Sequence, residues 1–407
     1  MKEPKLRFKG YTGEWVEKKL GDIVERITRK NQHLASDLPL TISAQYGLID
    51  QNEFFEKRVA SKDVSGYYLI QKGEFAYNKS TSTEAPWGAI KRLDRYENGV
   101  LSTLYIVFGI KDEEGINSDY LVSYYDTELW HKGIRAIAAE GARNHGLLNI
   151  APADFFHTKL MVPKDISEQE QIGKYFSVLN RLVILYQRKF DEIKELKKYM
   201  LQKMFPQNGE NVPVIRFGGF TDTWEQRKFG ELVEKYEDPV ETPIDGYMRL
   251  GIRSHAKGTF HSYVEAGKEL ETAKMFRVAE NKFIVNITFG WEHAVAITDK
   301  EDAGMLVSHR FPQYSFNEGM VPKFFRYLIL DEYFKHHLEL SSPGGAGRNR
   351  VLKLADMLEY KMTFPTKEEQ NKIAAYFDNL DHLITLHQRK LEKLKSIKKS
   401  MLQKMFV

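Results

Sequence analysis

The stretch Met200-Leu201-Gln202-Lys203-Met204-Phe205 decides the fold, because the chain repeats it without change as Met401-Leu402-Gln403-Lys404-Met405-Phe406. The residues before each copy are repeated as well. Working backwards, the matching pairs are Gln187-Arg188-Lys189 with Gln388-Arg389-Lys390, Tyr175-Phe176 with Tyr376-Phe377, and Glu168-Gln169 with Glu369-Gln370. A second block matches Arg7-Phe8 to Trp15 with Arg216-Phe217 to Trp224. The period is about two hundred residues, whereas solenoid repeats have about 20–50, so one whole module has been duplicated.

Apolar residues recur every three or four positions before each hexapeptide, which predicts a long amphipathic helix with a heptad seam. The seam residues are Ile172, Phe176, Leu179, Val183, Phe190 and Ile193 in the first copy, and Ile373, Phe377, Leu380, Ile384, Leu391 and Leu394 in the second. Lys197 and Lys398 interrupt the seam. One seam cannot be buried by itself, so we expect the two helices to pack on each other as an antiparallel coiled coil with pseudo-two-fold symmetry. The alternative is that each helix packs on its own domain.

The sequence between the repeated blocks diverges and indicates an α+β fold. Residues 101–110, 282–289 and 293–298 are rich in β-branched and aromatic residues, which favours strands. Apolar stripes predict helices at 119–138 and 322–340. A breaker-rich segment at 206–211 separates the halves. We therefore expect a globular domain at 1–163, a helix and linker at 164–206, a second globular domain at 207–365 and a second helix at 366–407.

The composition narrows the class of protein. The chain of 407 residues contains no cysteine, which excludes disulfides and thiolate metal sites and is typical of a reducing compartment. It has no apolar run of about 18 residues and no apolar segment near Met1, so we expect a cytoplasmic protein that neither crosses nor binds a membrane. A net charge of +4 permits binding to nucleic acid but does not require it.

The sequence contains no motif that indicates catalysis. A Walker-type phosphate loop and the tetrapeptide of amino-methyltransferases are both absent, and the glycines at 344–347 do not follow a clear strand. Glu359-Tyr360-Lys361, with Asp356 upstream, loosely resembles a nuclease pattern, but so short a pattern also arises by chance. The histidines lack metal-ligand spacing. We expect no catalytic, cofactor-binding or metal site in this chain.

Polar and basic side chains instead recur at equivalent places in the two copies. Arg and Lys suit guanine edges, Asn suits adenine, and Ser, Thr and Lys suit phosphates. Each residue taken singly is better explained as part of a solvated loop, but the recurrence makes an interface with DNA an equally good explanation. The candidates in the first copy are Asn78, Lys79, Ser80, Thr81, Ser82, Trp87, Arg143, Asn144 and His145. The candidates in the second copy are Arg249, Arg253, Ser254, His255, Lys257, Asn286, Thr288, Trp291, Arg348, Asn349 and Arg350.

Over essentially its whole length the chain resembles the specificity (S) subunit of a type I restriction-modification system. The resemblance rests on the paired Arg-Phe openings with their Trp, the paired Glu-Gln helices with Gln-Arg-Lys in the middle, and the strand exits at Pro163 and Pro365. It implies two target recognition domains, each reading one half of an asymmetric bipartite site in double-stranded DNA. The helices would set the spacing between the half-sites and dock two modification (methyltransferase) subunits.

The resemblance also implies which reactions belong to partner subunits. The modification subunits would bind S-adenosylmethionine and methylate adenine N6, and restriction subunits would join them with ATP and magnesium. The chain itself would be non-catalytic and would hold no cofactor. One alternative is a duplicated coiled-coil adaptor that joins protein partners without reading DNA. Another, a self-contained restriction enzyme, is disfavoured by the missing motifs.

Overall fold

The computed structural model describes residues 3–43, 46–57, 59–83, 85–111, 115–138, 146–207, 210–268, 274–344 and 350–407. The chain forms two compact units. Unit 1 comprises Met1–Lys189 and His387–Val407, and unit 2 comprises Phe190–Leu386. The boundary divides both long helices, so each unit contains one globular domain, the first part of one long helix and the last part of the other.

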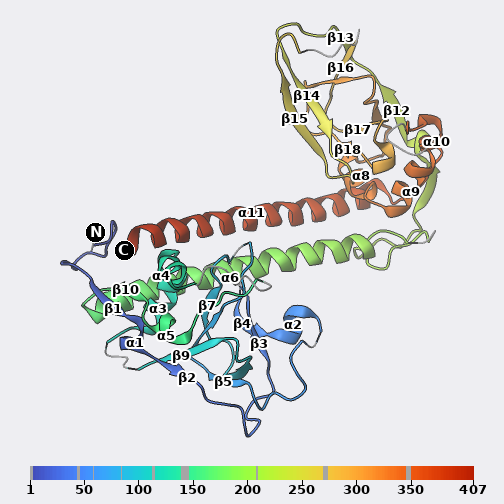
Figure 1. Ribbon diagram of the computed structural model, residues 1–407. Coiled ribbons are helices and arrows are strands. Elements are labelled where there is room, and N and C mark those ends of the chain that lie inside the picture. Colours follow the sequence, from blue (N-terminus) through green and yellow to red (C-terminus); the bar gives the residue numbers. More distant parts are fainter. Residues whose placement is uncertain are drawn as a thin grey trace. The chain divides into compact units, whose positions relative to one another are not determined.

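The domain of unit 1 is built on a four-stranded antiparallel sheet in the order β2-β9-β6-β7. Two further strand pairs, β3–β4 and β5–β8, belong to the same domain, and β1 pairs with β10 at the point where the domain begins and ends (Figure 1). The elements in chain order are β1 (Val16–Lys19), α1 (Leu20–Ile23), β2 (Val24–Ile27), β3 (Leu40–Ser43), β4 (Gly47–Asp50), α2 (Gln51–Phe55), β5 (Tyr68–Gln71), β6 (Phe75–Asn78), β7 (Ala89–Arg92), β8 (Asn98–Leu101), β9 (Ile106–Ile110), α3 (Ser118–Tyr125), α4 (Leu129–Ile137), α5 (Pro152–Phe156), β10 (Lys159–Val162) and α6 (Ile166–Lys203).

The domain of unit 2 repeats the four-stranded antiparallel sheet, in the order β12-β20-β17-β18, and adds a five-stranded sheet in the order β13-β16-β19-β14-β15. The strands β11 and β21 pair as β1 and β10 do in unit 1. The elements are β11 (Glu225–Lys228), α7 (Phe229–Leu232), β12 (Val233–Tyr236), β13 (Pro239–Val240), β14 (Tyr247–Ile252), β15 (Thr259–Val264), β16 (Met275–Arg277), β17 (Lys282–Val285), η1 (Gly290–Glu292), β18 (Val295–Ile297), β19 (Leu306–Ser308), β20 (Gln313–Phe316), α8 (Pro322–Leu328), α9 (Glu332–Leu340), α10 (Leu354–Leu358), β21 (Lys361–Phe364) and α11 (Lys367–Met405).

Several expected elements are shorter than the periodicity predicts. The expected helix at 119–138 is two helices, α3 and α4, and the one at 322–340 is also two, α8 and α9. Thr127 Oγ1 accepts a hydrogen bond from the backbone of Leu129, and the side chain of Asp331 caps α9. The expected strand at 101–110 is broken by a turn before β9, and those at 282–289 and 293–298 are reduced to β17 and β18. The apolar spacing continues through these turns, so the sequence pattern does not show where one element ends and the next begins.

The repeated residues at the start of each module build the same frame in both units. The Arg7 guanidinium donates two hydrogen bonds, at 2.7 and 2.8 Å, to the buried carboxylate of Glu168. Arg216 and Glu369 form the same paired contact, both bonds at 2.7 Å. A buried ion pair of this kind is strongly destabilising to break, because the partner charge remains buried. The matched arginines and glutamates therefore fasten each opening segment to the long helix of its own module.

The glutamine that follows each glutamate holds the domain to the helix. The amide of Gln169 donates to the Pro163 carbonyl at 3.0 Å and accepts from the Asn117 backbone at 2.9 Å. Gln370 makes the equivalent bonds to Pro365 and from Val321, both at 2.9 Å. Each Glu-Gln pair thus has a structural role, which explains why it recurs unchanged.

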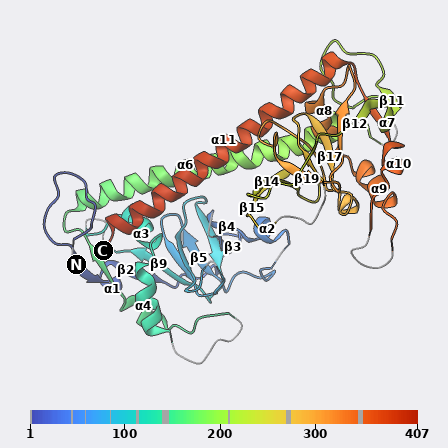
Figure 2. The same cartoon turned by 90° about the horizontal axis from the view of Figure 1, so that it is seen from above.

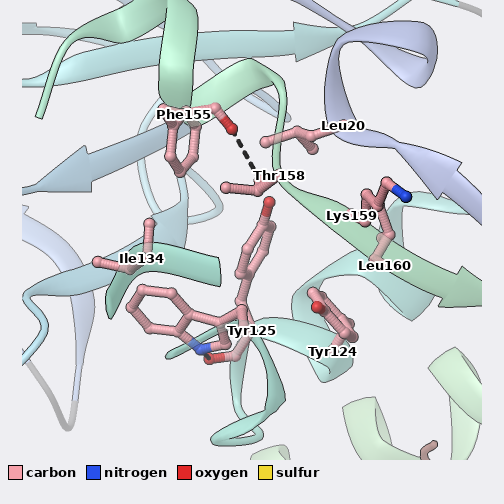
Figure 3. A pocket seen from close by; sticks show the side chains of 9 residues that line it. Leu20, Tyr124, Tyr125, Ile134, Phe155, Thr158, Lys159 and Leu160 are labelled. Atoms are coloured by element: carbon pink, nitrogen blue, oxygen red, sulfur yellow. Dashed lines mark hydrogen bonds between the residues drawn. The ribbon is translucent and has the colours of Figure 1, made fainter. Parts of the chain in front are cut away.

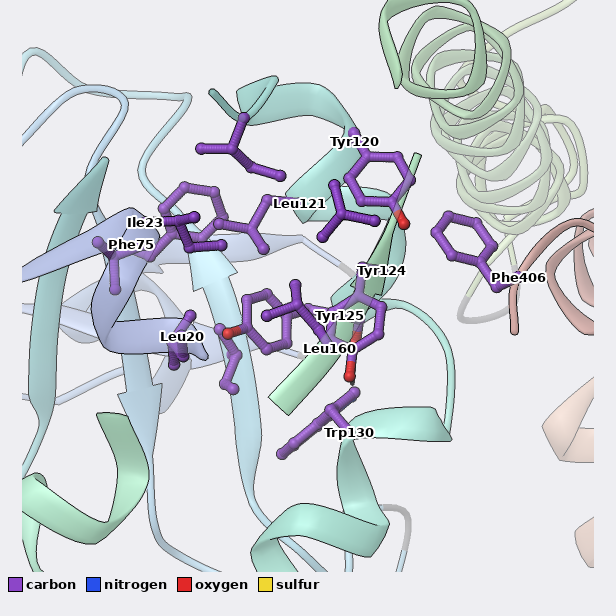
Figure 4. Close-up of a cluster of buried hydrophobic side chains, with 14 of the residues drawn as sticks. Leu20, Ile23, Phe75, Tyr120, Leu121, Tyr124, Tyr125, Trp130, Leu160 and Phe406 are labelled. Atoms are coloured by element: carbon purple, nitrogen blue, oxygen red, sulfur yellow. Dashed lines mark hydrogen bonds between the residues drawn. The ribbon is translucent and has the colours of Figure 1, made fainter. Parts of the chain in front are cut away.

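The two identical hexapeptides pack into the unit that contains the other module. In unit 1, the Phe406 ring lies 5.4 Å from Tyr120, centroid to centroid (Figure 4). It also lies 6.2 Å from the Trp15 ring and 5.8 Å from the Phe176 ring. The last turns of α11 accordingly lie beside α3 (Figure 2). The Leu6 backbone also donates to the Lys404 carbonyl at 2.9 Å.

Unit 2 receives the end of α6 in the same way. The Phe205 ring lies 6.2 Å from Trp224, 5.6 Å from Phe324 and 5.9 Å from Phe377. The Ile215 backbone donates to the Lys203 carbonyl at 2.8 Å, as Leu6 does to Lys404. The helix that follows the first domain therefore ends in the core of unit 2, and the helix that follows the second domain ends in the core of unit 1.

The seam residues divide their contacts between domain and helix. Ile172, Phe176 and Leu179 are buried in the core of unit 1, and Ile373, Phe377 and Leu380 are buried in the core of unit 2. Farther along α6 in unit 1, the Tyr186 ring faces His387 at 5.6 Å and Gln187 accepts from Lys395 at 3.2 Å. Since Phe176 meets Phe406 whereas Gln187 meets Lys395, the helix segments of unit 1 run antiparallel. The first seam residues of each helix therefore pack in the core of their own domain, and within unit 1 the segments of α6 and α11 also contact each other.

The remaining seam positions are buried or half-buried. Val183, Phe190, Ile193, Ile384 and Leu394 are half-buried, and Leu391 is buried. The lysines that interrupt the seam form ion pairs. In unit 1, Lys398 and Lys91 each donate to the Asp126 carboxylate at 2.7 Å. In unit 2, Lys197 pairs with Asp381 of α11 and lies 5.2 Å above the Tyr327 ring. The two lysines are equivalent in sequence, but their acidic partners come from different elements.

We expect the aromatic ends of the helices to stabilise opposite units. Phe205→Ala should destabilise unit 2 by about 3–5 kcal/mol, the usual cost of deleting a buried Phe ring, and should accelerate amide hydrogen exchange in α8. Phe406→Ala should do the same to α3 in unit 1. Leu196→Ala, at a side chain that is 44% exposed on α6, is the matched control and should change little. If Phe205→Ala accelerated amide hydrogen exchange in α3, it would contradict the packing of each helix end in the unit that contains the other module.

The Asp126 ion pairs predict a pH dependence of stability. Burial acts to raise the pKa of Asp126, but the charges of Lys91 and Lys398 outweigh it and lower the pKa to about 2. A lowered carboxyl pKa contributes stability above about pH 4, which is lost as the pH falls through about 2. Wild type should therefore exceed Asp126→Asn by about 2 kcal/mol in urea unfolding at pH 6. The difference should shrink toward pH 2, and a pH-independent difference would refute this assignment.

Candidate nucleic-acid interface

The polar loop of unit 1 begins where β6 ends. Asn78 Oδ1 accepts from the Ser80 backbone at 3.0 Å, which forms a side-chain turn, and Asn78 Nδ2 donates to the Tyr105 hydroxyl at 3.2 Å. Thr81 donates from its backbone to the Gly146 carbonyl at 2.6 Å, and Leu148 donates to the Lys79 carbonyl at 3.0 Å. The loop containing Asn78 to Ser82 therefore lies against residues 146–148. Arg143, Asn144 and His145, which directly precede that segment, lie outside the described residues.

Two other candidates of this loop have different roles: Trp87 packs on the core, and Lys79 carries a charge. Trp87 is half-buried against the core of unit 1, and its carbonyl accepts from the Tyr77 hydroxyl at 2.8 Å. Gly88 follows with φ +77°, and a Cβ there would lie 2.2 Å from the Asn78 carbonyl oxygen. Lys79 is half-buried, and burial lowers its pKa, as does the positive charge of Arg26 on β2. Trp87 thus holds the loop, whereas Ser80 and Ser82 are exposed and Lys79 is half-buried beside them.

Unit 2 builds the same turn at the end of β17. Asn286 Oδ1 accepts from the Thr288 backbone at 3.0 Å, and Leu352 donates to the Ile287 carbonyl at 2.9 Å. These bonds match those of Asn78 and Leu148 in unit 1, although the surrounding sequences differ. Asn286 is only 8% exposed, so its side chain is a structural part of the turn. The two units therefore share one framework for presenting a polar loop.

Trp291 lies on η1, just beyond this turn. The Arg350 guanidinium lies 5.5 Å above the Trp291 ring, a cation–π contact. Arg348 and Asn349 lie outside the described residues. A planar guanidinium held against an aromatic face loses less side-chain entropy when it binds a base edge or a phosphate. Arg350 is thus a positioned cation.

The basic cluster at 253–257 forms the turn between β14 and β15. His255 donates from its backbone to the Glu292 carbonyl and Ala256 to the His293 carbonyl, both at 2.8 Å. Ser254 donates its hydroxyl proton to the Glu292 carboxylate. These bonds hold His255 and Ala256 in left-handed conformations, with φ +61° and +49°. The turn is therefore held against η1, with Arg253, His255 and Lys257 exposed.

Arg249 lies four residues earlier on β14, half-buried, and donates to Ser262 at 3.4 Å.

One exposed arginine in this region was missed from the sequence. Arg310 donates to the Thr288 hydroxyl at 3.2 Å, and its carbonyl accepts from the Ile287 backbone at 3.0 Å. The contact joins a loop between β19 and β20 to the turn after β17, so no local pattern revealed it. Arg26 on β2, whose charge acts on Lys79, was also missed, because the two residues are far apart in the sequence. Unit 2 thus brings Thr288, Trp291, Arg310 and Arg350 close to the 253–257 turn.

Within the described residues, no group of three or more His, Asp or Glu side chains could hold a metal ion. The nuclease-like Glu359 forms an exposed ion pair with Lys228 at 2.6 Å. A small cavity of about 10 Å³ beside Tyr125 and Phe155 has room for a water molecule at most (Figure 3). The Thr158 hydroxyl donates to the Phe155 carbonyl at its edge. No helix of the described part is both long and apolar enough to cross a membrane.

Comparison with known proteins agrees with this architecture. Residues 221–396 match a family described as the type I restriction modification DNA specificity domain. The type I restriction enzyme MjaVIII specificity subunit of Methanocaldococcus jannaschii is 22% identical, over 96% of this chain and 91% of that protein. The putative MjaX specificity subunit of the same organism is also 22% identical, over 96% and 92%.

A solved structure shares the fold along the whole chain. The S subunit of a type I restriction-modification system from M. genitalium superposes with a TM-score of 0.60 at 13% identity, covering 100% of this chain and 99% of that one. The chain is thus similar over nearly its full length to two specificity subunits, and its second half matches the type I restriction modification DNA specificity domain.

Proposed function

We propose that this chain is the DNA-reading subunit of a type I restriction-modification complex and that each unit reads one half of an asymmetric bipartite site. The observation that carries the proposal is one framework presenting two different sets of side chains. The turns at Asn78 and Asn286 and the bonds from Leu148 and Leu352 are equivalent. Lys79, Ser80 and Ser82 follow the first turn, whereas Thr288, Arg310 and Arg350 surround the second. Different donors and acceptors select different bases.

The long helices would set the distance between the half-sites and dock the modification subunits. At about 1.5 Å per residue, a helix of 38 or 39 residues is roughly 57 Å long. Antiparallel packing along the full seam would give pseudo-two-fold symmetry, which makes two equivalent docking surfaces for two identical subunits. The matched frames around Glu168 and Glu369 support this, because equivalent partners require equivalent surfaces.

The chemistry would reside in the partner subunits. In this proposal the chain contributes no catalytic residue and binds no cofactor. S-adenosylmethionine would bind in the modification subunits, and ATP and magnesium would act where restriction subunits join. A purified chain that methylated DNA by itself would overturn this division of roles.

DNA reading is tested by binding to random-sequence duplexes in the presence of the modification subunit. We expect selection of a bipartite sequence, with an affinity that falls steeply as salt rises, because bound cations release counterions from the phosphates. Methylated adenines mapped in cells that carry the intact system should fall in the same sequence. If no sequence is selected, the chain is an adaptor that joins proteins without reading DNA.

Single substitutions should affect one half-site only. Arg350→Ala should relax selection in the half-site read by unit 2 by about 1–3 kcal/mol, the usual discrimination of one good base contact. Lys79→Ala, in unit 1, should weaken binding without changing the bases selected in the half-site read by unit 1. Arg227→Ala, a partly exposed arginine on β11, is the control and should alter neither affinity nor sequence. If Arg350→Ala relaxed both half-sites, the model of two independent readers would be wrong.

A further inference from the structure

On the basis of the proposed function, in which each unit reads one half-site, we infer that one equivalent position selects a base in each half. Leu104 selects thymine in the half-site read by unit 1, and Arg310 selects guanine in the half-site read by unit 2. Both residues lie in the connection that enters an inner strand of the four-stranded sheet, β9 in unit 1 and β20 in unit 2. We call Leu104 and Arg310 the selector residues.

The selector residues occupy the same place in matching turns. The backbone N–H of each donates to the hydroxyl of the serine two residues earlier, at 3.4 Å in both units. The residue that follows each selector residue donates from its backbone to the carbonyl of that same serine, at 3.1 Å in unit 1 and 3.0 Å in unit 2. Since both bonds are repeated, the two frameworks hold the selector residues at equivalent positions although the side chains differ.

Each selector residue lies opposite a residue of contrasting chemistry on the neighbouring strand. Continuing the register of β6 and β9 beyond their last pair places Lys79 opposite Leu104. In unit 2 the same continuation places Ile287 opposite Arg310, and the Ile287 backbone donates to the Arg310 carbonyl at 3.0 Å. Each unit therefore has one cation and one aliphatic side chain at this point, and the two units have them on opposite strands.

Leu104 suits contact with the methyl group of thymine. Its side chain is 56% exposed at a turn, where Gly, Pro, Asn, Asp and Ser are the usual residues. A single exposed leucine is ordinary on a protein surface, but this one occupies the place of an arginine of the candidate interface. An aliphatic side chain forms no hydrogen bond with a phosphate, and the apolar group that bases present in the major groove is the C5-methyl of thymine. Leu104 therefore favours thymine over cytosine by apolar contact.

Arg310 suits the edge of guanine. Its side chain is exposed, and Nη1 donates to the Thr288 hydroxyl at 3.2 Å. That bond uses one of the five N–H groups of the guanidinium and orients the rest of the planar fork. An oriented guanidinium donates paired hydrogen bonds to O6 and N7 of guanine, which is the commonest specific contact between a side chain and a base.

The exchange of cation and aliphatic group permits a test at constant charge. In unit 1 the positive charge belongs to Lys79 and selection belongs to Leu104, whereas in unit 2 Arg310 has both. Lys79→Ile combined with Leu104→Arg therefore reproduces the unit 2 pair in unit 1 without changing the net charge. Selection from random-sequence duplexes in the presence of the modification subunit then reports the bases chosen by wild type and by the double variant.

We expect the double variant to change one base pair of the half-site read by unit 1 from thymine to guanine. The preference for guanine there should be about tenfold, the ratio that one good paired contact provides. Every other position, including the whole half-site read by unit 2, should keep its wild-type preference. Leu129→Ala, at a leucine of α4 that is 42% exposed, is the control for loss of a surface aliphatic group and should select the wild-type sequence.

A second measurement uses wild type and single-atom changes in the DNA. Deoxyuridine in place of each thymine in turn removes one methyl group, and at one position of the unit 1 half-site it should weaken binding about fourfold. Leu104→Ala should bind the two duplexes equally, whereas Leu129→Ala should still distinguish them. In the unit 2 half-site, 7-deazaguanine at one guanine should weaken wild type about tenfold, because N7 no longer accepts a charged hydrogen bond. Arg310→Ala should be insensitive to that change.

Three outcomes would overturn the assignment of the selector residues while leaving the proposed function intact. Wild type would select a bipartite sequence, but the double variant would select the same bases. No deoxyuridine substitution would weaken wild type more than it weakens Leu104→Ala. Arg310→Ala would weaken binding equally for every base, which would make Arg310 a phosphate contact. If wild type itself selected no sequence, the proposed function would fail, and the selector residues with it.

Discussion

The cores of both units depend on two phenylalanines, one just beyond the end of each long helix. Phe406 completes the aromatic core around Trp15, and Phe205 completes the core around Trp224. Each belongs to the helix of the other module, so neither module contains all of its own core. The buried pairs Arg7–Glu168 and Arg216–Glu369 then fasten each opening segment to the helix of its own module.

The duplicated frame could be predicted from the sequence because it is repeated and periodic. The repeats located both long helices, and their seam residues are buried or half-buried throughout. The breaks between α3 and α4 and between α8 and α9 could not be predicted, because each contains one polar side chain that accepts a backbone hydrogen bond within an apolar stripe. The two seam lysines looked like interruptions. Their role became clear only from partners far away in sequence, Asp126 for Lys398 and Asp381 for Lys197.

The candidate interface could be predicted in part. Residue types marked the loops after β6 and β17, and the structure assigns Asn78 and Asn286 to holding those loops in shape. Trp87 is an anchor for its loop. Arg26 and Arg310 escaped prediction because they reach the loops across strands, where sequence spacing carries no information. Residue types therefore located the polar loops, whereas the tertiary contacts determined which residues shape each loop and which carry an exposed charge beside it.

The pairing of β1 with β10, and of β11 with β21, has a consequence for how this architecture changes over time. Lys19 lies opposite Lys159, and Lys228 lies opposite Lys361, so each domain leaves the frame and returns to it on adjacent antiparallel strands. Neighbouring strands are only about 4.8 Å apart. A foreign domain therefore needs to satisfy one short distance at its two ends, whatever its internal fold. Recombination between the matched flanking sequences would then replace one globular domain in a single step and leave the long helices unchanged.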